Sequence, residues 1–277
     1  MGYIEKSIGC FSNSLDKNNL DSMIWFTNRK QDSDIEVAMG ISECSSLNPK
    51  EAFSSKFIKN EITRLFQQNE YKNLAASLDI DSHNYPLILK EAMENINSRI
   101  YTELNSKIEP DESTSSATIA ISSEMYIHII NIGKCKVYQI RGGKIAPLTE
   151  VHTFIEKIKS NKKNNEAPHP HAEKDYFNSL YRGLGMHPWV KLESKSFRVE
   201  PDDIYVFCNK GLYNFLDEKK ILMTMLGMEV NPQKGCENLV KLAVEKNNNA
   251  LTNVACLYYS NYMGLDLKNT DATIPFR

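Results

Sequence analysis

The chain has 277 residues, of which 41% are hydrophobic and 25% are charged, and this composition is typical of a folded globular protein with a substantial core. Its 33 basic and 35 acidic side chains give a formal net charge of -2, which argues against binding to nucleic acid or to an anionic membrane. The first residues lack a basic segment followed by an apolar run, and no stretch approaches the roughly 18 apolar residues of a membrane span, so we expect a cytoplasmic protein.

The first predicted elements are strands followed by helices. Two short β-rich runs, residues 23–27 and 35–41, are separated by a polar turn and predict a pair of adjacent strands that opens the fold. Pro49 then begins a run with apolar residues at helical spacing up to Phe66, which predicts a helix. A second long helix is predicted over residues 86–104, and the two helices are expected to pack side by side.

Strands dominate the middle third of the sequence. Four strand-like runs between residues 117 and 148 are broken by Ser-Ser, Gly-Lys and Gly-Gly turns, and they predict an antiparallel meander. The polar run at residues 159–175 contains Lys, Asn and Pro without apolar periodicity. It predicts an exposed, mobile insertion, and the sequence does not define what this insertion contacts.

The last third alternates between strands and helices. The sequence returns to β-structure with a Glu-Pro-Asp-Asp turn at residues 200–203, followed by predicted helices at residues 212–226 and 236–246 and by a last strand at residues 253–261. Because each element must bury one face, this order predicts strands stacked on strands with helices outside. We expect one domain, residues 1–262, followed by a C-terminal tail, residues 263–277.

The stretch YVFCNKGLYNFL, residues 205–216, is an apolar strand that runs into a glycine turn and an amphipathic helix. Active sites often lie at such strand-to-helix corners. Lys210 stands just before Gly211, and the role of this lysine decides what the corner can do.

Several motifs resemble those of the protein phosphatase 2C family, the metal-dependent PPM-type serine/threonine phosphatases. The family's LTEDH is similar to LTEVH at 148–152, its RALG…P to RGLGMHP at 182–188, and its EPGDxLLLCSDGL to EPDDIYVFCNKGL at 200–212. Its NNEDS resembles NNLDS at 18–22, and its closing DN and strand resemble TNVACLYYS from Thr252. The resemblance covers most of the chain and implies an α+β fold, a four-layer αββα sandwich of two antiparallel sheets flanked by helix pairs, with a cleft at one edge.

The resemblance also implies a chemistry. In the family, two manganese or magnesium ions are held by acidic side chains from distant segments and bridge a water or hydroxide. This nucleophile attacks the phosphorus of a phosphoserine or phosphothreonine, while an arginine holds the phosphate.

Most of these positions differ in the present chain. The alignment places Ser42 at the family's bridging aspartate and Glu43 at the glycine whose carbonyl is a ligand, while Glu51 keeps a later acid. The acid of CSDGL becomes Lys210 and the acid of the closing DN becomes Thr252.

The N-terminal motif is also altered. Leu20 replaces its glutamate, Asp21 keeps its aspartate, and Asp16 falls where the family has the phosphate-binding arginine. The acid of the central GDSR turn becomes Lys134. Because a dication needs anionic oxygens to replace its hydration, and an ammonium adds repulsion, we expect no resident metal; Asp21 and Glu43 are weak candidate ligands for a single ion.

Lys210 suggests two alternatives. In the first alternative, its ammonium lies where an ion would otherwise be and pairs with Asp21 or Glu43. In the second, it points into solvent and has no role. Together with Lys134 it is also a candidate phosphate-binding residue, because both ammonium groups would attract a phosphate as point charges.

Three functions are compatible with these residues. The favoured hypothesis is a catalytically inactive pseudophosphatase domain that binds a protein partner or a phosphorylated protein in signalling. The alternative is an active Mn/Mg-dependent serine/threonine phosphatase with an atypical metal site, and a third possibility is a structural subunit of a larger assembly. The sequence does not define the partner, the pathway, the oligomeric state or any residual metal binding.

The remaining candidate sites have simpler interpretations. Six cysteines lie without a CxxC pair, and Cys44, Cys135 and Cys208 fall on motifs near the expected cleft, so a thiolate zinc site or redox sensor competes with buried, inert thiols. His169 and His171 lack accompanying cysteines or carboxylates at ligand spacing, so we interpret them as part of a solvated loop.

Overall fold

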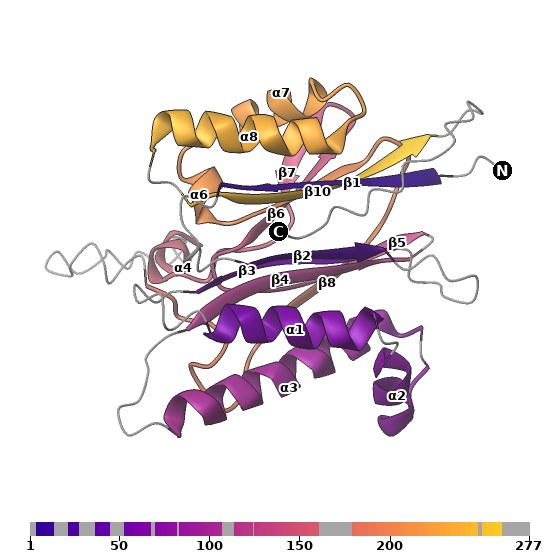
Figure 1. Cartoon of the computed structure of the whole chain (residues 1–277), viewed down its shortest axis with the longest axis vertical. Helices are drawn as coiled ribbons and strands as arrows, with labels where there is room; N and C mark the ends of the chain where they lie inside the picture. Colours follow the sequence, from indigo (N-terminus) through magenta and orange to yellow (C-terminus); the bar gives the residue numbers. More distant parts are fainter. Residues whose placement is uncertain are drawn as a thin grey trace, which may run out of the picture.

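The protein forms a sandwich of two sheets with helices on both outer sides (Figure 1). The computed structural model describes residues 4–13, 22–27, 37–44, 53–67, 70–81, 83–106, 114–123, 125–160, 179–248 and 251–261. Every pair of neighbouring strands in the two sheets is antiparallel. The predicted αββα sandwich of two antiparallel sheets is therefore confirmed.

Each sheet has five strands. The first sheet has the order β1-β10-β9-β6-β7, with β1 at Ile4–Ser12, β10 at Asn253–Asn261, β9 at Ile204–Cys208, β6 at Lys136–Arg141 and β7 at Lys144–Pro147. The second sheet has the order β2-β3-β4-β5-β8, with β2 at Ser22–Thr27, β3 at Val37–Cys44, β4 at Ser115–Ser122, β5 at Tyr126–Ile132 and β8 at Glu193–Arg198.

Helices cover the outer face of each sheet (Figure 1). The second sheet is covered by α1 (Phe53–Gln67), α2 (Glu70–Ser77) and α3 (Tyr85–Asn105), and the first sheet by α6 (Lys210–Tyr213), α7 (Glu218–Leu226) and α8 (Pro232–Lys246). A short helix, α4 (Phe154–Ser160), lies at the edge where α6 also lies.

Three apolar layers hold the sandwich together. The middle layer lies between the sheets and contains Met39, Phe207 and Leu257, while separate layers lie under α1 and α3 and under α7 and α8. Every residue of β4, a strand of small and β-branched side chains, is buried, because β4 has sheet on one face and helices on the other. Tyr205 and Phe207 are fully buried, as the sequence predicts, whereas the side chains of Trp25 and Phe26 lie outside the described part of the chain.

The sequence prediction missed three features. The fold does not open with β2 and β3, because β1 precedes them and pairs with β10. The helix α2 was not predicted. The helix predicted over residues 212–226 is interrupted, because Asp217 caps α7 by accepting a hydrogen bond from the backbone N–H of Lys220 at 2.7 Å, and aspartate favours this N-cap position over a helix interior.

The predicted antiparallel meander is wrong. The strands β4 and β5 pair with each other, and so do β6 and β7, but β5 and β6 belong to different sheets. The chain crosses between the sheets at Gly133, whose φ of 91° is in the region that favours glycine. The Glu-Pro-Asp-Asp turn likewise connects β8 in one sheet to β9 in the other.

Some predictions fall outside the described residues. The tail at residues 263–277 and most of the polar run at residues 159–175, including His169 and His171, are among them. Of the helices that the structure describes, none combines the length and the apolar character needed to cross a bilayer.

Candidate functional site

Hydrogen bonds join the strand-to-helix corner between β9 and α6 to the segment that leads into β10. Asn209 donates through its side-chain amide to the carbonyl oxygen of Leu251 at 2.9 Å, and its Oδ1 accepts from the backbone N–H of Asn253 at 3.0 Å. Thr252 donates through Oγ1 to the carbonyl oxygen of Gly211 at 3.0 Å. These contacts place Lys210 and Thr252 at the same corner, as the resemblance predicts.

Gly211 is required by this close approach. A Cβ atom at this position would lie 2.0 Å from the carbonyl oxygen of Leu251, well inside van der Waals contact. Only a residue without a side chain lets α6 begin this close to the neighbouring backbone.

Lys210 reaches across the cleft to the opposite sheet. Its Nζ lies 2.6 Å from Oε1 of Glu43, at the end of β3, and its backbone N–H lies 3.4 Å from Oε2 of the same carboxylate. The Glu43 side chain is 3% exposed and the Lys210 side chain is 47% exposed. Of the two alternatives raised by the sequence, pairing of Lys210 with Glu43 is therefore confirmed, and an unpaired, solvent-directed Lys210 is wrong.

Lys134 brings a second ammonium group to the same region. It follows Gly133 in the crossing between β5 and β6, where its backbone N–H donates to Oγ of Ser116 at 2.9 Å and its carbonyl accepts from the Tyr213 hydroxyl at 2.7 Å. Burial lowers the pKa of Lys134, the nearby Lys210 lowers it further, and Glu43 acts in the opposite direction. The described cleft thus gathers two ammonium groups around one carboxylate.

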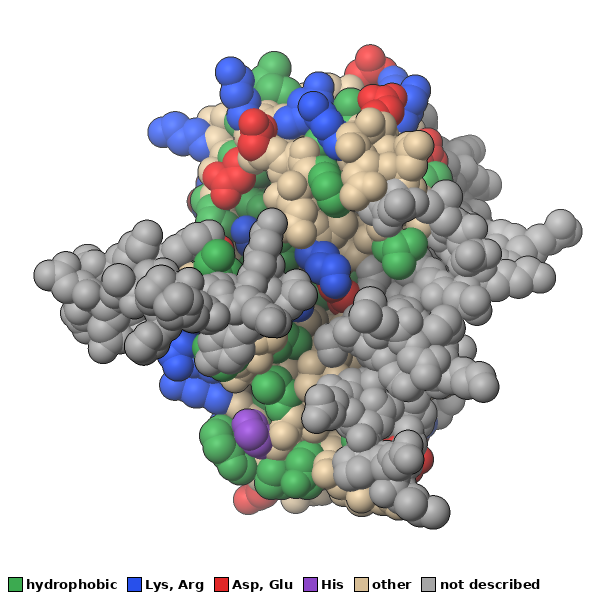
Figure 2. Space-filling model, turned by 90° about the vertical axis from the view of Figure 1, so that its left-hand side faces the viewer, with side chains coloured by type: hydrophobic (Ala, Val, Ile, Leu, Met, Phe, Trp, Pro, Cys, Tyr) green, Lys and Arg blue, Asp and Glu red, His purple; other side chains and the backbone are tan. Residues whose placement is uncertain are grey.

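The edge of the sandwich that holds α6 and α4 faces the viewer in Figure 2. Basic and acidic side chains lie beside one another there, midway between the two helical layers.

His152 supports the crossing that carries Lys134. Its Nδ1 accepts a hydrogen bond from the backbone N–H of Gly133 at 3.0 Å, and its own backbone N–H donates to the Gly133 carbonyl at 2.8 Å. Burial lowers the pKa of His152 to about 4, and Arg182 contributes in the same direction. The ring is therefore neutral at physiological pH with its proton on Nε2. The LTEVH motif contains this histidine, but its role in holding the loop is visible only in the structure.

The other predicted site positions have different outcomes. Ser42 is fully buried and directly precedes Glu43 on β3, and it is the Glu43 carboxylate that faces Lys210. Asp16, Leu20 and Asp21 lie outside the described residues, as does Glu51. The structure therefore brings together Glu43, Lys134, Lys210 and Thr252, and it leaves the N-terminal positions of the site as predictions.

The described donors do not fit a pair of dications. Glu43 is an acid, but it is bound to an ammonium, and the remaining described positions are two lysines, a serine and a threonine. Within the described part of the chain, no three His, Cys, Asp or Glu side chains are grouped as a metal site would require. Because Asp21 is not described, the expectation that the protein holds no resident metal stays a prediction.

The cysteines near the cleft are buried. Cys135 and Cys208 form no disulfide and are fully buried, and burial raises the pKa of Cys208 to about 12. Such a thiol is protonated at neutral pH and is a poor nucleophile or metal ligand. The buried, inert interpretation holds for Cys208, while the side chain of Cys44 is not described.

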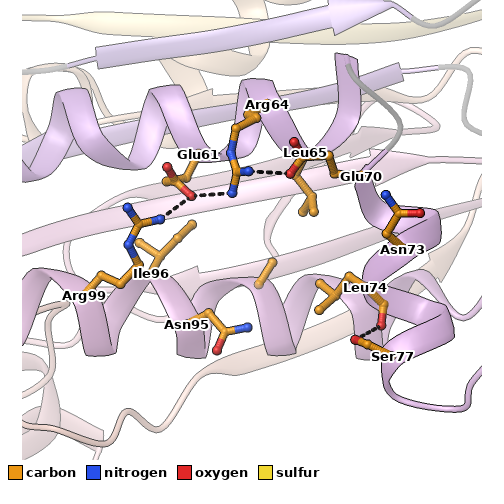
Figure 3. A pocket seen from close by; sticks show the side chains of 11 residues that line it. Glu61, Arg64, Leu65, Glu70, Asn73, Leu74, Ser77, Asn95, Ile96 and Arg99 are labelled. Atoms are coloured by element: carbon orange, nitrogen blue, oxygen red, sulfur yellow. Dashed lines mark hydrogen bonds and ion pairs between the residues drawn. The ribbon is translucent and has the colours of Figure 1, made fainter.

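A separate hollow of about 360 Å³ lies between α1, α2 and α3 (Figure 3). Glu61 binds Arg64 at 3.0 Å and Arg99 at 2.7 Å, and Arg64 also binds Glu70 at 2.7 Å. Because these charges satisfy one another, we interpret the network as a link between the three helices.

Comparison with known proteins identifies the class of fold. The chain is similar to a serine/threonine phosphatase from S. agalactiae, with a TM-score of 0.74 and 17% identity over 92% of this chain and 100% of that chain. It is also similar to the catalytic domain of the serine threonine protein phosphatase PstP in complex with two manganese ions, with a TM-score of 0.71 and 14% identity over 94% and 100% of the chains. Stp1 from Staphylococcus aureus gives a TM-score of 0.70 and 16% identity over 94% and 97%.

These similarities define the PPM-type phosphatase fold. The model of the protein phosphatase 2C family matches residues 25–157, and with this fold it confirms the resemblance read from the motifs. No curated protein matches the sequence at a significant level.

Proposed function

We propose that the protein is a pseudophosphatase, a PPM-type domain that binds a phosphorylated protein in the cytoplasm without hydrolysing it. The observation that carries the proposal is the ion pair between Lys210 and Glu43. The buried carboxylate of the described cleft is held by an ammonium group at 2.6 Å, so its negative charge is already compensated without a metal ion.

The same ion pair preserves the shape of the cleft. The contact joins the end of β3 in one sheet to the first residue of α6, which follows β9 in the other sheet. A metal ion bridging acids would supply a comparable link across the cleft. Lys210 thus provides the connection between the sheets but cannot activate a water molecule, because an ammonium is not a Lewis acid.

Phosphate recognition follows from the charge of the cleft. Lys134 and Lys210 supply two ammonium groups, whereas Glu43 is the carboxylate that the described part of the cleft provides to balance them. A phosphate placed between the lysines would compensate the remaining positive charge and form charge-assisted hydrogen bonds. The partial burial of Lys134 strengthens such an interaction, because water screens it less.

Calorimetry with a phosphoserine peptide and its unphosphorylated form tests the binding step. We expect only the phosphorylated peptide to bind, and we expect Lys134→Ala to weaken binding by about tenfold through loss of a charge-assisted contact. The two described hydrogen bonds of Lys134 are made by its backbone, so this variant removes the ammonium and keeps those contacts. Equal binding of both peptides, or no binding, would contradict phosphate recognition.

The alternative is an active Mn/Mg-dependent serine/threonine phosphatase, which is favoured by the family match and by the manganese bound to the similar PstP domain. Incubation with manganese and p-nitrophenyl phosphate separates the two functions. The pseudophosphatase releases no p-nitrophenol above a no-enzyme control. Sustained release that stops with EDTA and in Asp21→Ala would establish the phosphatase instead.

A further inference from the structure

A second hollow has a volume of about 440 Å³, and neither Lys210 nor Glu43 lines it. Its walls come from α4, from the segment that contains the RGLGMHP motif, and from the residues that lead into β8. None of the cleft residues Glu43, Lys134, Lys210 and Thr252 lines it. The volume is within the range of about 300–1,000 Å³ that small-molecule sites occupy.

The charged side chains of this hollow are mostly basic. Among the described residues that line it, Lys157, Arg182 and Lys191 occur together with one carboxylate, that of Glu150. Within the described residues, neither the Arg182 guanidinium nor the Lys191 ammonium takes part in an ion pair. The described lining therefore carries an excess of positive charge, and it favours an anionic ligand with more than one negative charge.

An aromatic platform adjoins these cations. Trp189 is 71% exposed, and its indole stacks on the His187 ring with a centroid distance of 5.6 Å and an interplanar angle of 17°. A second ring contact is made by Arg182, which lies 5.1 Å from the centroid of the Tyr181 ring. A single exposed tryptophan needs no explanation on its own, but here it borders a basic hollow.

The segment that carries this platform is fixed in place. Asn97 of α3 donates through its side-chain amide to the His187 carbonyl at 3.0 Å and accepts through Oδ1 from the Gly185 N–H at 2.9 Å. Leu184 is bonded in both directions to Ser115 of β4, at 2.8 and 3.2 Å. Because the backbone of this segment is already ordered, binding of a ligand to Trp189 costs little conformational entropy of the protein.

We propose that this hollow binds a nucleoside polyphosphate such as ATP, with the base stacked on Trp189 and the phosphates held by Arg182, Lys191 and Lys157. Stacking on an exposed indole accepts any base, because every base has a π-face. The cations form charge-assisted hydrogen bonds with phosphate oxygens. The site is independent of the proposed phosphopeptide cleft, since the two share no residue.

A compact hollow with a stacking platform favours a nucleotide over a phosphorylated peptide. An extended peptide would place its phosphate on the cations, but it would contact the indole only if an aromatic residue lay next to the phosphorylated residue. A nucleotide brings a flat ring and several negative charges in one molecule, which matches both features of the site.

Isothermal titration calorimetry with ATP in the presence of EDTA tests the proposal. We expect ATP to bind more tightly than either tripolyphosphate or adenosine, since each of these engages only part of the site. We expect Trp189→Ala to weaken ATP binding by about tenfold and Trp189→Phe to restore most of it. Arg182→Ala and Lys191→Ala should each weaken binding several-fold, whereas Lys144→Ala, which removes an exposed lysine on β7, should leave it unchanged.

Several outcomes would overturn the assignment. These are the absence of ATP binding, equal binding of tripolyphosphate and ATP with no effect of Trp189→Ala, equal binding of adenosine and ATP, and binding of a phosphopeptide, but not of ATP, that is lost in Arg182→Ala. The exposed positions of Trp189 and Lys191 allow these variants to fold, and circular dichroism of each variant confirms this before titration.

Discussion

At the scale of single residues, the Lys210 and Glu43 pair combines a buried acid with a half-exposed base. Removing one partner from such a pair leaves the other charge without compensation. We expect Lys210→Met to lower the free energy of unfolding by about 1–3 kcal/mol, less than for a fully buried pair because water reaches Lys210. Urea denaturation at pH 7 measures this loss, with Lys219→Met, an exposed lysine of α7, as the control.

A double-mutant cycle with Glu43→Gln separates the ion pair from other effects of the substitutions. If Lys210 and Glu43 act as a pair, the two losses are not additive, and the coupling exceeds about 0.5 kcal/mol. Additive losses would mean that the two residues stabilise the cleft separately.

His152 makes the stability of the protein depend on pH in the acid range. Its pKa is about 4 in the folded protein, against 6.5 for an unperturbed histidine, so between these values the unfolded chain binds a proton that the folded chain does not. The stability that this histidine contributes is therefore present above pH 6.5 and is lost as the pH falls toward 4, by up to about 3 kcal/mol. His152→Asn keeps an oxygen acceptor for the Gly133 N–H and removes the titration.

Urea denaturation at several pH values between 4.5 and 7.5 checks this prediction. The slope of stability against pH should be smaller in His152→Asn than in the unmodified protein, while His83→Asn, which alters an exposed histidine, should not change it. Burial also lowers the pKa of His128, and that contribution remains in both proteins. Equal slopes would show that His152 does not control the acid response.

At the scale of elements, the junction between α6 and the start of β10 depends on Gly211. Gly211→Ala places a Cβ 2.0 Å from the Leu251 carbonyl oxygen. Because this neighbour is a backbone atom, it cannot move aside as the end of a flexible side chain would. We expect a loss of about 3 kcal/mol. Gly227→Ala is a matched control, because its Cβ would meet its nearest neighbour, the Met223 carbonyl oxygen, at 3.4 Å. A cost for Gly211→Ala no larger than that of the control would mean that this junction is loosely packed.

The elements also show what local patterns can predict. The helices α1 and α3 and the runs that form β4 to β7 follow from apolar periodicity and glycine turns, so the sequence predicts them with small errors at their ends. The assignment of β5 and β6 to different sheets depends on the long-range pairing of β5 with β8 and of β6 with β9. Local spacing does not contain that information, and the meander prediction failed for this reason.

At the scale of the whole molecule, the site exists only after both sheets have assembled. The contact between the Lys210 N–H and Glu43 joins residues 167 positions apart in the chain. The motif resemblance placed Lys210, Glu43, Lys134 and Thr252 at one cleft, because it carries the arrangement of a known fold. The motifs do not show the supporting contacts of Tyr213, Ser116 and His152, although His152 lies in LTEVH, so these contacts required the structure.

The predicted boundary after residue 262 is testable by truncation. The strand β10 lies between β1 and β9 in the first sheet, and its residues Val254, Ala255, Cys256, Leu257 and Tyr259 are 0% exposed. A chain that ends at residue 252 loses this inner strand and the partner of β1, so we expect it not to fold. A chain that ends at residue 262 keeps the complete sheet, and we expect its urea midpoint to match that of the full chain. A stability loss of more than about 1 kcal/mol in the longer truncation would place residues 263–277 in the packed domain, since surface changes away from such contacts stay within about 0.5 kcal/mol.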